Sequence, residues 1–432
     1  MKLLIVGNGA REHIITEALK ASPSRPQLFA YMSTANPGIQ ALVEDSAQGA
    51  IDDIQVIKRY AQHIRPDIVV FGSEAPLAVG AVDALNEIGI SCVGPAKSLA
   101  RIEADKAFMR DFMGRYIRRG FPQWKVFDSL KSVEDYLQRN PSVVLKPIGL
   151  TGGKGVRVMG RQLVGIDDAI EYAQEVIAEH GRILVEEKLD GEEFSLMVFT
   201  DGKEIIPMPL VQDYKYAKEG NTGAMTGGMG SYSQADHRLP FVSERDFDNA
   251  LSIVSDTIWQ LSQAEGKPYK GILYGQFIQT EDGPKIVEFN VRFGDPEAMN
   301  VLSIMGSDLV EVFRSIAEGN LIDRVEFERK ATVCKYLVPN GYPETPEAER
   351  PFHFPWQELS EEGIRVYFAS VREENGSFFT TRSRSLALLQ TAPTAQEAKD
   401  SINEVLNRYC PPELVYRQDI PLCGPEVPAQ KT

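Results

Sequence analysis

Two lysines on either side of a glycine-rich turn are the first residues in this chain whose types and spacing suggest chemistry. They stand in residues 145–158, LKPIGLTGGKGVRV, as Lys146 and Lys154. Glycine lets backbone N–H groups approach phosphate oxygens closely, and lysine ammonium groups neutralise those oxygens. The stretch is not a strand-to-helix P-loop, because Gly155 follows Lys154 and a strand-like run comes next. An ordinary hairpin turn is the alternative, but the two lysines favour a nucleotide.

A possible metal site follows in residues 285–297, KIVEFNVRFGDPE. Residues two apart on a strand face the same side, so Glu288, Asn290 and Arg292 are expected on one face, with Val287, Phe289 and Val291 on the other. One carboxylate and one amide oxygen, completed by phosphate oxygens and water, suit Mg²⁺. Gln276 on the preceding strand is expected to add an oxygen, and Arg292 to clamp a carboxylate. A half-exposed edge strand is the alternative.

Two further stretches resemble parts of nucleotide sites. In residues 183–195, ILVEEKLDGEEFS, backbone groups near Glu186, Lys188 or Leu189 can meet an adenine, and Glu193 a ribose; a solvated acidic hairpin is the alternative. At the N-terminus, the apolar run Leu3–Val6 leads directly into GNGAREH, and many nucleotide-binding domains begin with such a pattern. A dinucleotide site would have glycine where Glu12 stands and an acid after the second strand, and neither is present. His13, beside this turn, is expected to pack.

The first hundred residues alternate between apolar runs and helical patterns, which predicts a parallel, doubly wound, Rossmann-like sheet. Ligands bind beyond the carboxyl ends of such strands, so residues 7–12, 36–38 and 72–74 are expected to converge. The expected strands are 3–6, 28–32, 68–71 and 91–93, and the expected helices are 10–20, 54–64 and 77–88.

The rest of the chain reads as α+β. Strands 143–146, 156–159 and 183–187 with one helix near 167–178 predict a small lid. Residues 213–235 are glycine-rich and are expected to be a working loop. A helix at 244–264, strands 272–279 and 285–289, and a helix at 395–409 follow. The predicted domains are residues 1–104, 105–330 with a mobile lid at about 125–190, and a small α+β domain at 331–422, followed by a flexible tail at 423–432.

Composition limits the class of protein. The 432 residues are 43% hydrophobic and 25% charged, with a formal net charge of −15, which disfavours nucleic acids and membrane surfaces as partners. The four cysteines are scattered, which indicates reduced thiols in the cytoplasm. No stretch is long and apolar enough to span a membrane.

Taken in order, the motifs resemble the ATP-grasp superfamily and, within it, the glycinamide ribonucleotide synthetase family, in its archaeal-like branch. The likeness covers about the first 330 residues. It is carried by GNGAREH at 7–13, GSEAPL at 72–77, KAFMRDFM at 106–113, LTGGKGV at 150–156, TGGMGSYS at 226–233 and EFNVRFGDPEAMN at 288–300. After residue 340 the chain departs from the family's Thr-Asn-Gly-Gly-Arg turn, and Arg382 or Arg384 could serve instead.

The resemblance implies an ADP-forming C–N ligase of purine biosynthesis that joins glycine to 5-phosphoribosylamine through glycyl phosphate. It implies ATP with Mg²⁺ or Mn²⁺, a cytoplasmic location, and a monomer or weak homodimer. Three alternatives remain open: an ATP-grasp ligase for another acid and amine, a dinucleotide oxidoreductase, and a non-catalytic nucleotide sensor.

The resemblance also assigns roles to residues. Arg292, Lys154 and Asp213 would be catalytic, and Gln276, Glu288 and Asn290 would bind the metal. The implied ATP-binding residues are Lys106, Lys146, Gly152, Gly153, Lys154, Gly155, Glu186, Glu187, Lys188, Leu189 and Glu193. The implied substrate-binding residues are Gly7, Asn8, Gly9, Arg11, Glu12, Glu74, Asp213, Gly228, Met229, Gly230, Arg292 and Asp295. Gly7, Gly9 and Arg11 would hold the sugar phosphate, and Asp213 the ammonium of glycine.

Overall fold

The structure is a computed structural model and describes residues 1–150 and 155–422. Its N-terminal sheet is parallel, with strand order β3-β2-β1-β4-β5. Near-continuous apolar runs make β1, β2, β4 and β5, because helices cover both faces of the sheet. The strands are β1 (Lys2–Val6), β2 (Gln27–Met32), β3 (Asp45–Gln48), β4 (Ile68–Phe71) and β5 (Ser91–Val93). The helices are α1 (Ala10–Lys20), α2 (Pro37–Gln40), α3 (Ile54–Ile64), α4 (Glu74–Val79) and α5 (Ala81–Asn86).

The predicted strands and helices of this sheet are present, with three differences. The single helix expected at 77–88 is two helices, since Gly80 between them has a φ of +100°. Strand β3 was not predicted because its sequence, DSAQ, carries no apolar signal. The short α2 was also missed; it starts at Asn36, whose side chain accepts hydrogen bonds from the N–H groups of Gly38 and Ile39.

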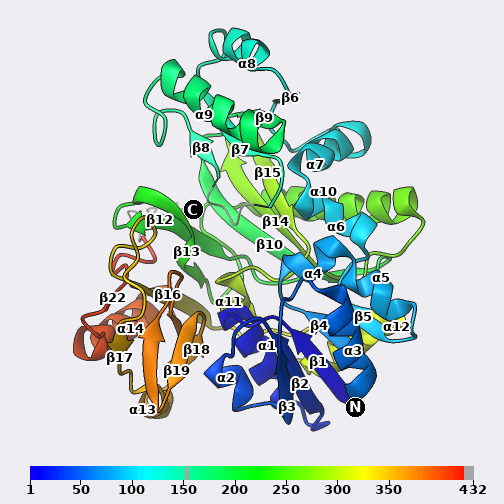
Figure 1. Cartoon of the computed structure of the whole chain (residues 1–432), viewed down its shortest axis with the longest axis vertical. Coiled ribbons are helices and arrows are strands. Elements are labelled where there is room, and N and C mark those ends of the chain that lie inside the picture. Colours follow the sequence, from blue (N-terminus) through cyan, green and yellow to red (C-terminus); the bar gives the residue numbers. More distant parts are fainter. Residues whose placement is uncertain (151–154, 423–432) are drawn as a thin grey trace, which may run out of the picture.

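The lid region lies at the top of Figure 1 and has a hydrophobic core of its own. Its sheet has the order β6-β9-β7-β8, made of β6 (Trp124–Phe127), β7 (Val143–Pro147), β8 (Arg157–Val158) and β9 (Ile183–Glu187). Two helices pack on it, α8 (Leu130–Leu137) and α9 (Ile166–His180), so the expectation of one helix was wrong. The missed α8 buries only Val133 and Leu137, a short i, i+4 signal. Helices α6 (Lys97–Ala104) and α7 (Lys106–Phe112) and the π-helical turn η1 (Met113–Ile117) lead into this region.

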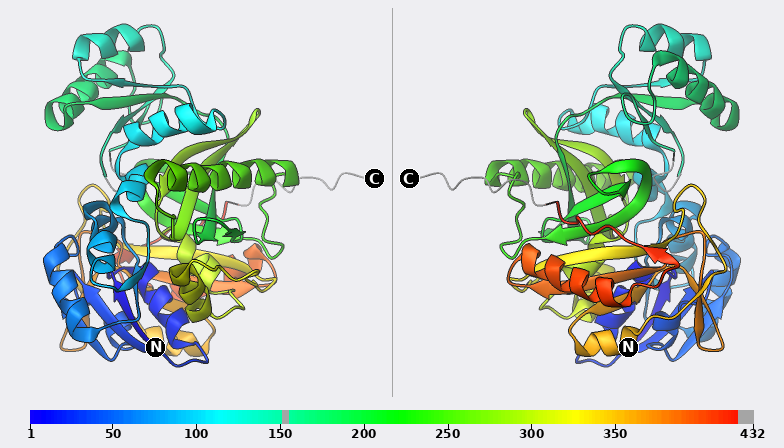
Figure 2. Two further views of the ribbon diagram at one scale, coloured as in Figure 1. Left: turned by 90° about the vertical axis from the view of Figure 1, so that its right-hand side faces the viewer. Right: turned by 90° about the vertical axis from the view of Figure 1, so that its left-hand side faces the viewer.

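An antiparallel sheet of order β11-β10-β14-β15 lies below the lid. It contains β10 (Glu192–Thr200), β11 (Ile205–Pro207), β14 (Gly271–Thr280) and β15 (Gly283–Asn290). Figure 2 shows α10 (Glu244–Glu265) crossing the middle of the molecule, between the lid and the N-terminal sheet. Two helices, α11 (Glu297–Leu302) and α12 (Leu309–Glu318), follow this sheet along the chain. None of the helices in the described ranges combines the length and apolarity needed to cross a membrane.

Strand β15 has an irregularity that changes which side chains face the cavity described below. Gln276 pairs with Glu288, but the next residue, Phe277, pairs with Ile286, so Val287 is an extra residue on β15. A bulge of this kind interrupts the alternation of side chains. As a result Val287 and Glu288 line the same cavity, and the expectation that Val287 faces the opposite side was wrong.

The glycine-rich stretch expected to be a loop is instead a β-hairpin of β12 (Gln212–Lys218) and β13 (Thr222–Ser233). A side chain on Gly230 would place its Cβ 2.4 Å from the carbonyl oxygen of Cys334 on strand β16 (Ala331–Pro339). Glycine therefore permits the close approach of two backbones, and pairing with β16 makes the segment a strand. The prediction failed because the partner strand is about a hundred residues away in the sequence.

This hairpin continues into the C-terminal sheet, in the order β12-β13-β16-β21-β18, with β22 paired to β16. The C-terminal elements, at the lower left of Figure 1, also include a small sheet of order β17-β20-β19. Helix α14 has the bounds that the sequence predicted. The elements are β16 (Ala331–Pro339), β17 (Pro351–Phe352), α13 (Trp356–Glu361), β18 (Arg365–Phe368), β19 (Val371–Glu374), β20 (Ser377–Thr380), β21 (Leu386–Ala392), α14 (Ala395–Tyr409) and β22 (Leu414–Val415).

His13 on α1 joins the N-terminal and C-terminal sheets. Its Nδ1 accepts a hydrogen bond of 3.1 Å from the N–H of Phe368 on β18, and its ring lies edge-on to Tyr367. Burial lowers the pKa of His13 to about 3. His13 therefore packs in the neutral form, which suits an interface between two layers.

Acidification should weaken this interface. Below about pH 6.5 the unfolded chain binds a proton at His13, whereas the folded chain does not bind it until about pH 3. The free energy of unfolding therefore decreases as the pH falls from about 6.5 to about 3. From pH 7 to pH 5, this one group should cost about 2 kcal/mol. The urea midpoint of the wild type should fall more between these pH values than that of His13→Gln, which accepts the same hydrogen bond without titrating. Equal decreases of the urea midpoint in the wild type and in His13→Gln would contradict the neutral, buried state assigned to His13.

Candidate active site

A cavity of about 380 Å³ lies where all of these layers meet. Its wall draws on the lid through Lys146 and Arg161, and on β15 through Glu288 and Asn290. Helices α1 and α4 beside the N-terminal sheet supply Arg11 and Glu74, and the segment between β20 and β21 supplies Arg384. The stretches singled out in the sequence therefore come together at one place.

The lid side of the cavity rests on a buried triad of charges. The Glu186 carboxylate lies 2.7 Å from Lys146 Nζ and 2.5 Å from Arg110 Nε. Burial alone would raise the pKa of Glu186, but the charges of Arg110 and Lys146 lower it to about 2. Arg110 also donates to the carbonyls of Ile286 and Val287, which ties the lid strand β9 to the bulge of β15. Glu186 is thus a buried anchor for Lys146.

The predicted adenine edge follows Glu186 along β9. Glu187, Lys188 and Leu189 line the cavity, as Glu186 does. The N–H of Glu187 is bonded to the carbonyl of Gln123, and that of Lys188 to Ser142. Gly155, one of the four predicted ATP-binding residues at 152–155, lies inside the described ranges, and its carbonyl accepts a hydrogen bond from the Tyr172 hydroxyl. The other three, Gly152, Gly153 and Lys154, lie outside the described residues.

Cationic and anionic groups alternate across the middle of the cavity. Lys106 Nζ donates to the carbonyl of Gly149 at 2.8 Å, and burial lowers the pKa of its ammonium, opposed by Glu288. Burial raises the pKa of Glu288, but Lys215, Lys106 and Lys146 outweigh it and lower the pKa. Glu288 is therefore an ionised carboxylate facing three lysines, a setting in which it can hold a cation beside phosphate.

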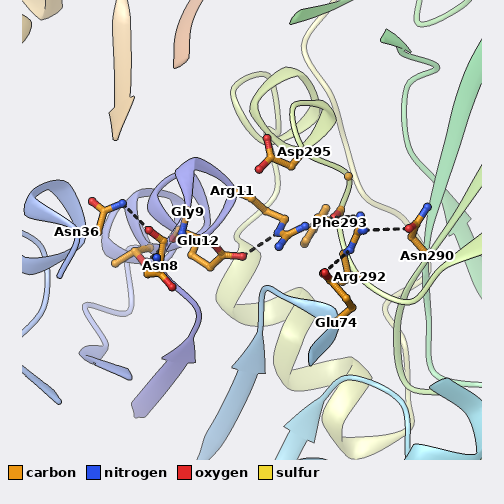
Figure 3. A network of polar contacts seen from close by, with 12 residues as sticks. Asn8, Gly9, Arg11, Glu12, Asn36, Glu74, Asn290, Arg292, Phe293 and Asp295 are labelled. Atoms are coloured by element: carbon orange, nitrogen blue, oxygen red, sulfur yellow. Dashed lines mark hydrogen bonds and ion pairs between the residues drawn. The ribbon is translucent and has the colours of Figure 1, made fainter. Parts of the chain in front are cut away.

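Asn290, the other predicted metal ligand, is oriented by Arg292 (Figure 3). Arg292 Nη2 donates to Asn290 Oδ1 at 2.9 Å and lies 2.9 Å from Glu103 Oε1. Its Nε lies 3.4 Å from Glu74 Oε2. Between them, Glu74 and Glu103 already pair with the guanidinium of Arg292. Arg292 can therefore meet a substrate carboxylate only while it also pairs with these acids. In the same way, Glu74 can bind a substrate only while it also pairs with Arg292.

For Gln276, the third predicted metal ligand, the metal role stays a prediction, and its side chain contacts protein groups in this structure. It is fully buried, and it is absent from the described residues that line the cavity. Its Oε1 accepts a hydrogen bond from Tyr274, and its Nε2 donates to Glu193 and Asp213 at 3.1 and 3.2 Å. Gln276 therefore positions the two carboxylates. Residues 1–150 and 155–422 contain no cluster of three or more His, Cys, Asp or Glu side chains that could hold a metal ion, so a metal here needs other oxygens, such as the Asn290 amide, beside Glu288.

Asp213 and Glu193 both form ion pairs with Lys215, which was not among the residues predicted from the sequence. Lys215 Nζ lies 3.1 Å from Glu193 and 3.6 Å from Asp213. Burial raises the pKa of Asp213, and Lys215 opposes that shift. Asp213 and Lys215 are two apart on β12, so their side chains share a face, and that spacing was the available signal.

The N-terminal turn differs from its predicted role as a cradle of backbone donors. The N–H of Gly7 bonds to the Tyr31 carbonyl, and that of Gly9 bonds to Glu12 Oε2 at 2.5 Å. Glu12 also accepts from Arg11 Nε at 2.8 Å, so it caps α1 and orients Arg11 (Figure 3). Arg11 reaches the cavity wall and donates to the Phe293 carbonyl. Arg11 is thus the group of this turn that lines the cavity, and the phosphate-binding role predicted for the turn stays a prediction.

The turns of the N-terminal sheet nevertheless converge. Asn36 Nδ2 donates to the Asn8 carbonyl at 2.9 Å and to the Phe368 carbonyl at 2.7 Å. Gly72 lies against Glu12, since a Cβ there would be 2.3 Å from Glu12 Cγ. The predicted meeting of residues 7–12, 36–38 and 72–74 is therefore observed, although Gly7, Asn8 and Gly9 lie beside the cavity wall rather than in it.

The described chain matches three family models of phosphoribosylglycinamide synthetase. They are its N domain at residues 1–103, its ATP-grasp (A) domain at residues 104–298 and its C domain at residues 332–422. The chain belongs to this family.

Relatives agree with this family assignment. A curated phosphoribosylamine–glycine ligase from Methanocella arvoryzae is 47% identical over 92% of this chain and 91% of that protein. The crystal structure of phosphoribosylamine–glycine ligase from Thermotoga maritima has a TM-score of 0.81 at 26% identity, covering 97% of this chain and all of that one. The biotin carboxylase domain of 2-oxoglutarate carboxylase from Hydrogenobacter thermophilus, solved with MgADP and bicarbonate, shares the fold at 16% identity and a TM-score of 0.70, over 96% of this chain and 91% of that one. The predicted family, fold class and ADP-forming glycine ligation are confirmed.

Strand β13, which carries the predicted substrate-binding residues Gly228, Met229 and Gly230, is held by Arg384 from the segment between β20 and β21. Arg384 Nη1 donates to the carbonyls of Gly227 and Gly228 at 3.0 Å, and its Nη2 lies 3.0 Å from Asp295 Oδ2. Thr226 and Gly227 line the cavity, whereas Met229 is in the hydrophobic core and Gly230 faces β16. Gly228, Met229 and Gly230 are therefore not part of this cavity wall, and the substrate contacts predicted for them stay predictions. Of the two arginines considered, Arg382 is exposed and Arg384 is the one that reaches the site.

Replacing Arg384 should impair the use of glycine. Loss of its charge-assisted hydrogen bonds in Arg384→Ala should lower kcat/KM for glycine about 10–100-fold. Arg384→Lys should recover only part of this loss of kcat/KM, because an ammonium group lacks the planar fork with which Arg384 bonds two carbonyls and a carboxylate. Steady-state kinetics with varied glycine checks this, with Arg382→Ala as the matched control. Equal kinetics for the two alanine variants would contradict the role.

Three further buried, charged residues in or beside the site were not predicted from the sequence. Glu103, Arg110 and Glu297 are each less than 10% exposed. Glu103 follows Leu99 by one helical turn, so its position on the buried face of α6 was a usable signal. Arg110 and Glu297 lie inside motifs that were quoted, but nothing local distinguishes a buried charge from an exposed one.

Proposed function

We propose that this chain activates glycine as glycyl phosphate in the described cavity and transfers the glycyl group to the amine of 5-phosphoribosylamine. The observation that carries this proposal is the placement of Lys106, Lys146 and Glu288 on one side of the cavity, with Arg11 on another. One side suits a triphosphate and its metal, and the other suits a sugar phosphate.

The first half of the reaction is a phosphoryl transfer, which needs positioning and neutralisation of charge. Lys106 and Lys146 are assigned to the phosphates of ATP, and Glu193 to its ribose. Glu288 and Asn290 would hold Mg²⁺ or Mn²⁺, which would neutralise the triphosphate and polarise its terminal phosphoryl group when bound. The metal-bearing nucleotide in the Hydrogenobacter thermophilus structure supports this use of the fold.

The second half joins the two substrates. We assign Asp213 to the ammonium of glycine, Arg292 to its carboxylate, and Arg11 and Glu74 to 5-phosphoribosylamine. Both this amine and the acyl phosphate react with water, so the lid, residues 125–190, would close over them. Arg161 of the lid already meets Tyr216 of the β12–β13 hairpin, with its guanidinium 5.1 Å from the ring centre.

The proposal extends to the state of the protein in the cell. We place the enzyme in the cytoplasm, supported by the unpaired thiols of Cys92, Cys334 and Cys410 in the described chain. We propose a monomer or weak homodimer, which sedimentation at two concentrations tests.

The function is tested by following ADP release with 5-phosphoribosylamine generated in the assay. Release should require both glycine and the amine source, and alanine or serine should replace glycine poorly. Enzyme freed of metal should regain activity when Mg²⁺ is added. Adding Mn²⁺ instead, and comparing the two activities, shows which of the two metals the enzyme prefers. Turnover that ignores glycine would overturn the proposal.

A further inference from the structure

Glu297 occupies a position in the cavity for which neither the mechanism above nor the family assignment supplies a role. It is the first residue of α11, is 2% exposed, and lines the cavity wall. Its Oε1 accepts a hydrogen bond of 2.9 Å from the Tyr274 hydroxyl. A Cβ on Gly294 would lie 2.3 Å from Oε2, so this glycine leaves room for the carboxylate.

The elements around Glu297 belong to both substrate regions. Helix α11 packs against α1, which carries Arg11, and against β13 and β16. Strand β12 brings Asp213 and Lys215 toward it, and β14 brings Tyr274. The carboxylate therefore stands between the side assigned to the sugar phosphate and the side assigned to glycine, where the two substrates must meet.

The charges facing Glu297 come from several of these elements. Burial, and after it the negative charge of Asp213 on β12, raise the pKa of Glu297 to about 7 against the opposing effects of Tyr274 and Lys215. From β16, the Cys334 thiol faces it, and burial raises the pKa of that thiol well above its usual value. The ionisable groups that act on Glu297, or on which it acts, thus include Asp213, Lys215, Tyr274 and Cys334. A carboxyl group in such a setting can take up and release a proton near neutral pH.

We infer that Glu297 accepts the proton released when the amine of 5-phosphoribosylamine attacks glycyl phosphate. This inference rests on the proposed function. The amine nitrogen forms a bond to the glycyl carbonyl carbon, and the carbon–oxygen bond to phosphate breaks, with inorganic phosphate leaving on the electron pair. The proton lost by the nitrogen goes to the Glu297 carboxylate and from there to solvent, so the step is balanced without a further reactant.

Glutamine at this position separates the two halves of the reaction. Glu297→Gln keeps the shape and can still accept from Tyr274, but it takes up no proton. Glycyl phosphate can be trapped by hydroxylamine as glycine hydroxamate, with ATP and glycine present and the amine omitted. We expect hydroxamate within about threefold of wild type, while amide formation falls about 10²–10³-fold, the usual range for a proton-transfer group. The amide formed per ADP released should fall as well.

Two more measurements exclude a purely structural role. Between pH 6 and 8.5, wild-type amide formation per ADP should rise with pH around neutrality, and in Glu297→Gln it should be flat. Glu297→Asp restores a carboxylate and should return part of the transfer, and it also serves if the glutamine variant does not fold. Glu318→Gln, an exposed acid at the end of α12, is the matched control and should match wild type.

The outcomes are distinct. Equal losses of hydroxamate and amide in folded Glu297→Gln, unchanged amide formation, or no recovery in Glu297→Asp would each overturn the role of Glu297. No glycine-dependent hydroxamate from the wild type would instead overturn the glycyl phosphate of the proposed function, while leaving the family assignment in place.

Discussion

Replacing Glu288 by alanine should lower kcat for ADP formation by about 10³-fold or more, because one carboxylate then no longer helps to hold the metal at the triphosphate. Among the residues lining the cavity, Glu288 and Asn290 are the pair that offers oxygen ligands on β15. The charges of Lys215, Lys106 and Lys146 overcome burial and keep the pKa of Glu288 low, so the carboxylate is ionised at neutral pH.

The metal requirement provides a readout beyond activity. In Glu288→Ala, the Mg²⁺ concentration that gives half-maximal binding of a fluorescent ATP analogue should rise at least tenfold, corresponding to about 1.4 kcal/mol. Glu281→Ala, in the exposed turn of the same β14–β15 hairpin, is the matched control and should behave as wild type. Undiminished turnover in a folded Glu288→Ala variant would refute the metal assignment.

Replacing Lys146 by methionine should reduce kcat/KM for ATP by about 10²–10³-fold, since an ammonium aimed at phosphate in a partly dry cavity contributes several kcal/mol. The variant should still fold. Glu186 keeps Arg110 as a partner at 2.5 Å, so its carboxylate is not left as an unpaired buried charge. Its pKa should rise from about 2, because one of the two cations that lower it is gone.

The control for Lys146→Met is Lys125→Met, which removes an exposed lysine from β6 of the same lid sheet. Thermal unfolding with and without an ATP analogue separates the two effects: Lys146→Met should lose the stabilisation that the nucleotide provides and keep most of its stability without it. Equal nucleotide stabilisation in Lys146→Met and Lys125→Met would show that Lys146 does not meet the phosphates.

Much of this synthetase is encoded in local patterns. Continuous apolar runs predicted four strands of the N-terminal sheet, and the spacing of buried residues predicted α9, α10 and α14 within a few residues. Lysines beside glycines and the Glu-x-Asn-x-Arg spacing indicated phosphate and metal chemistry, because these residue types have few other uses in such arrangements. Local sequence therefore determined the element types and the residues that could do chemistry.

The tertiary structure decided how those residues are used. Pairing of β13 with β16 turned a glycine-rich loop into a strand, and the bulge at Val287 changed which face of β15 meets the cavity. Tyr274 donates a hydrogen bond to the Gln276 oxygen predicted to meet the metal, and Glu12 accepts one from the Gly9 amide predicted to meet phosphate. Each outcome depends on a partner that folding brings near, or on a bulge in the strand register. Periodicity reports only which face of an element is apolar, so it cannot state which donor or carboxylate will lie opposite a given side chain.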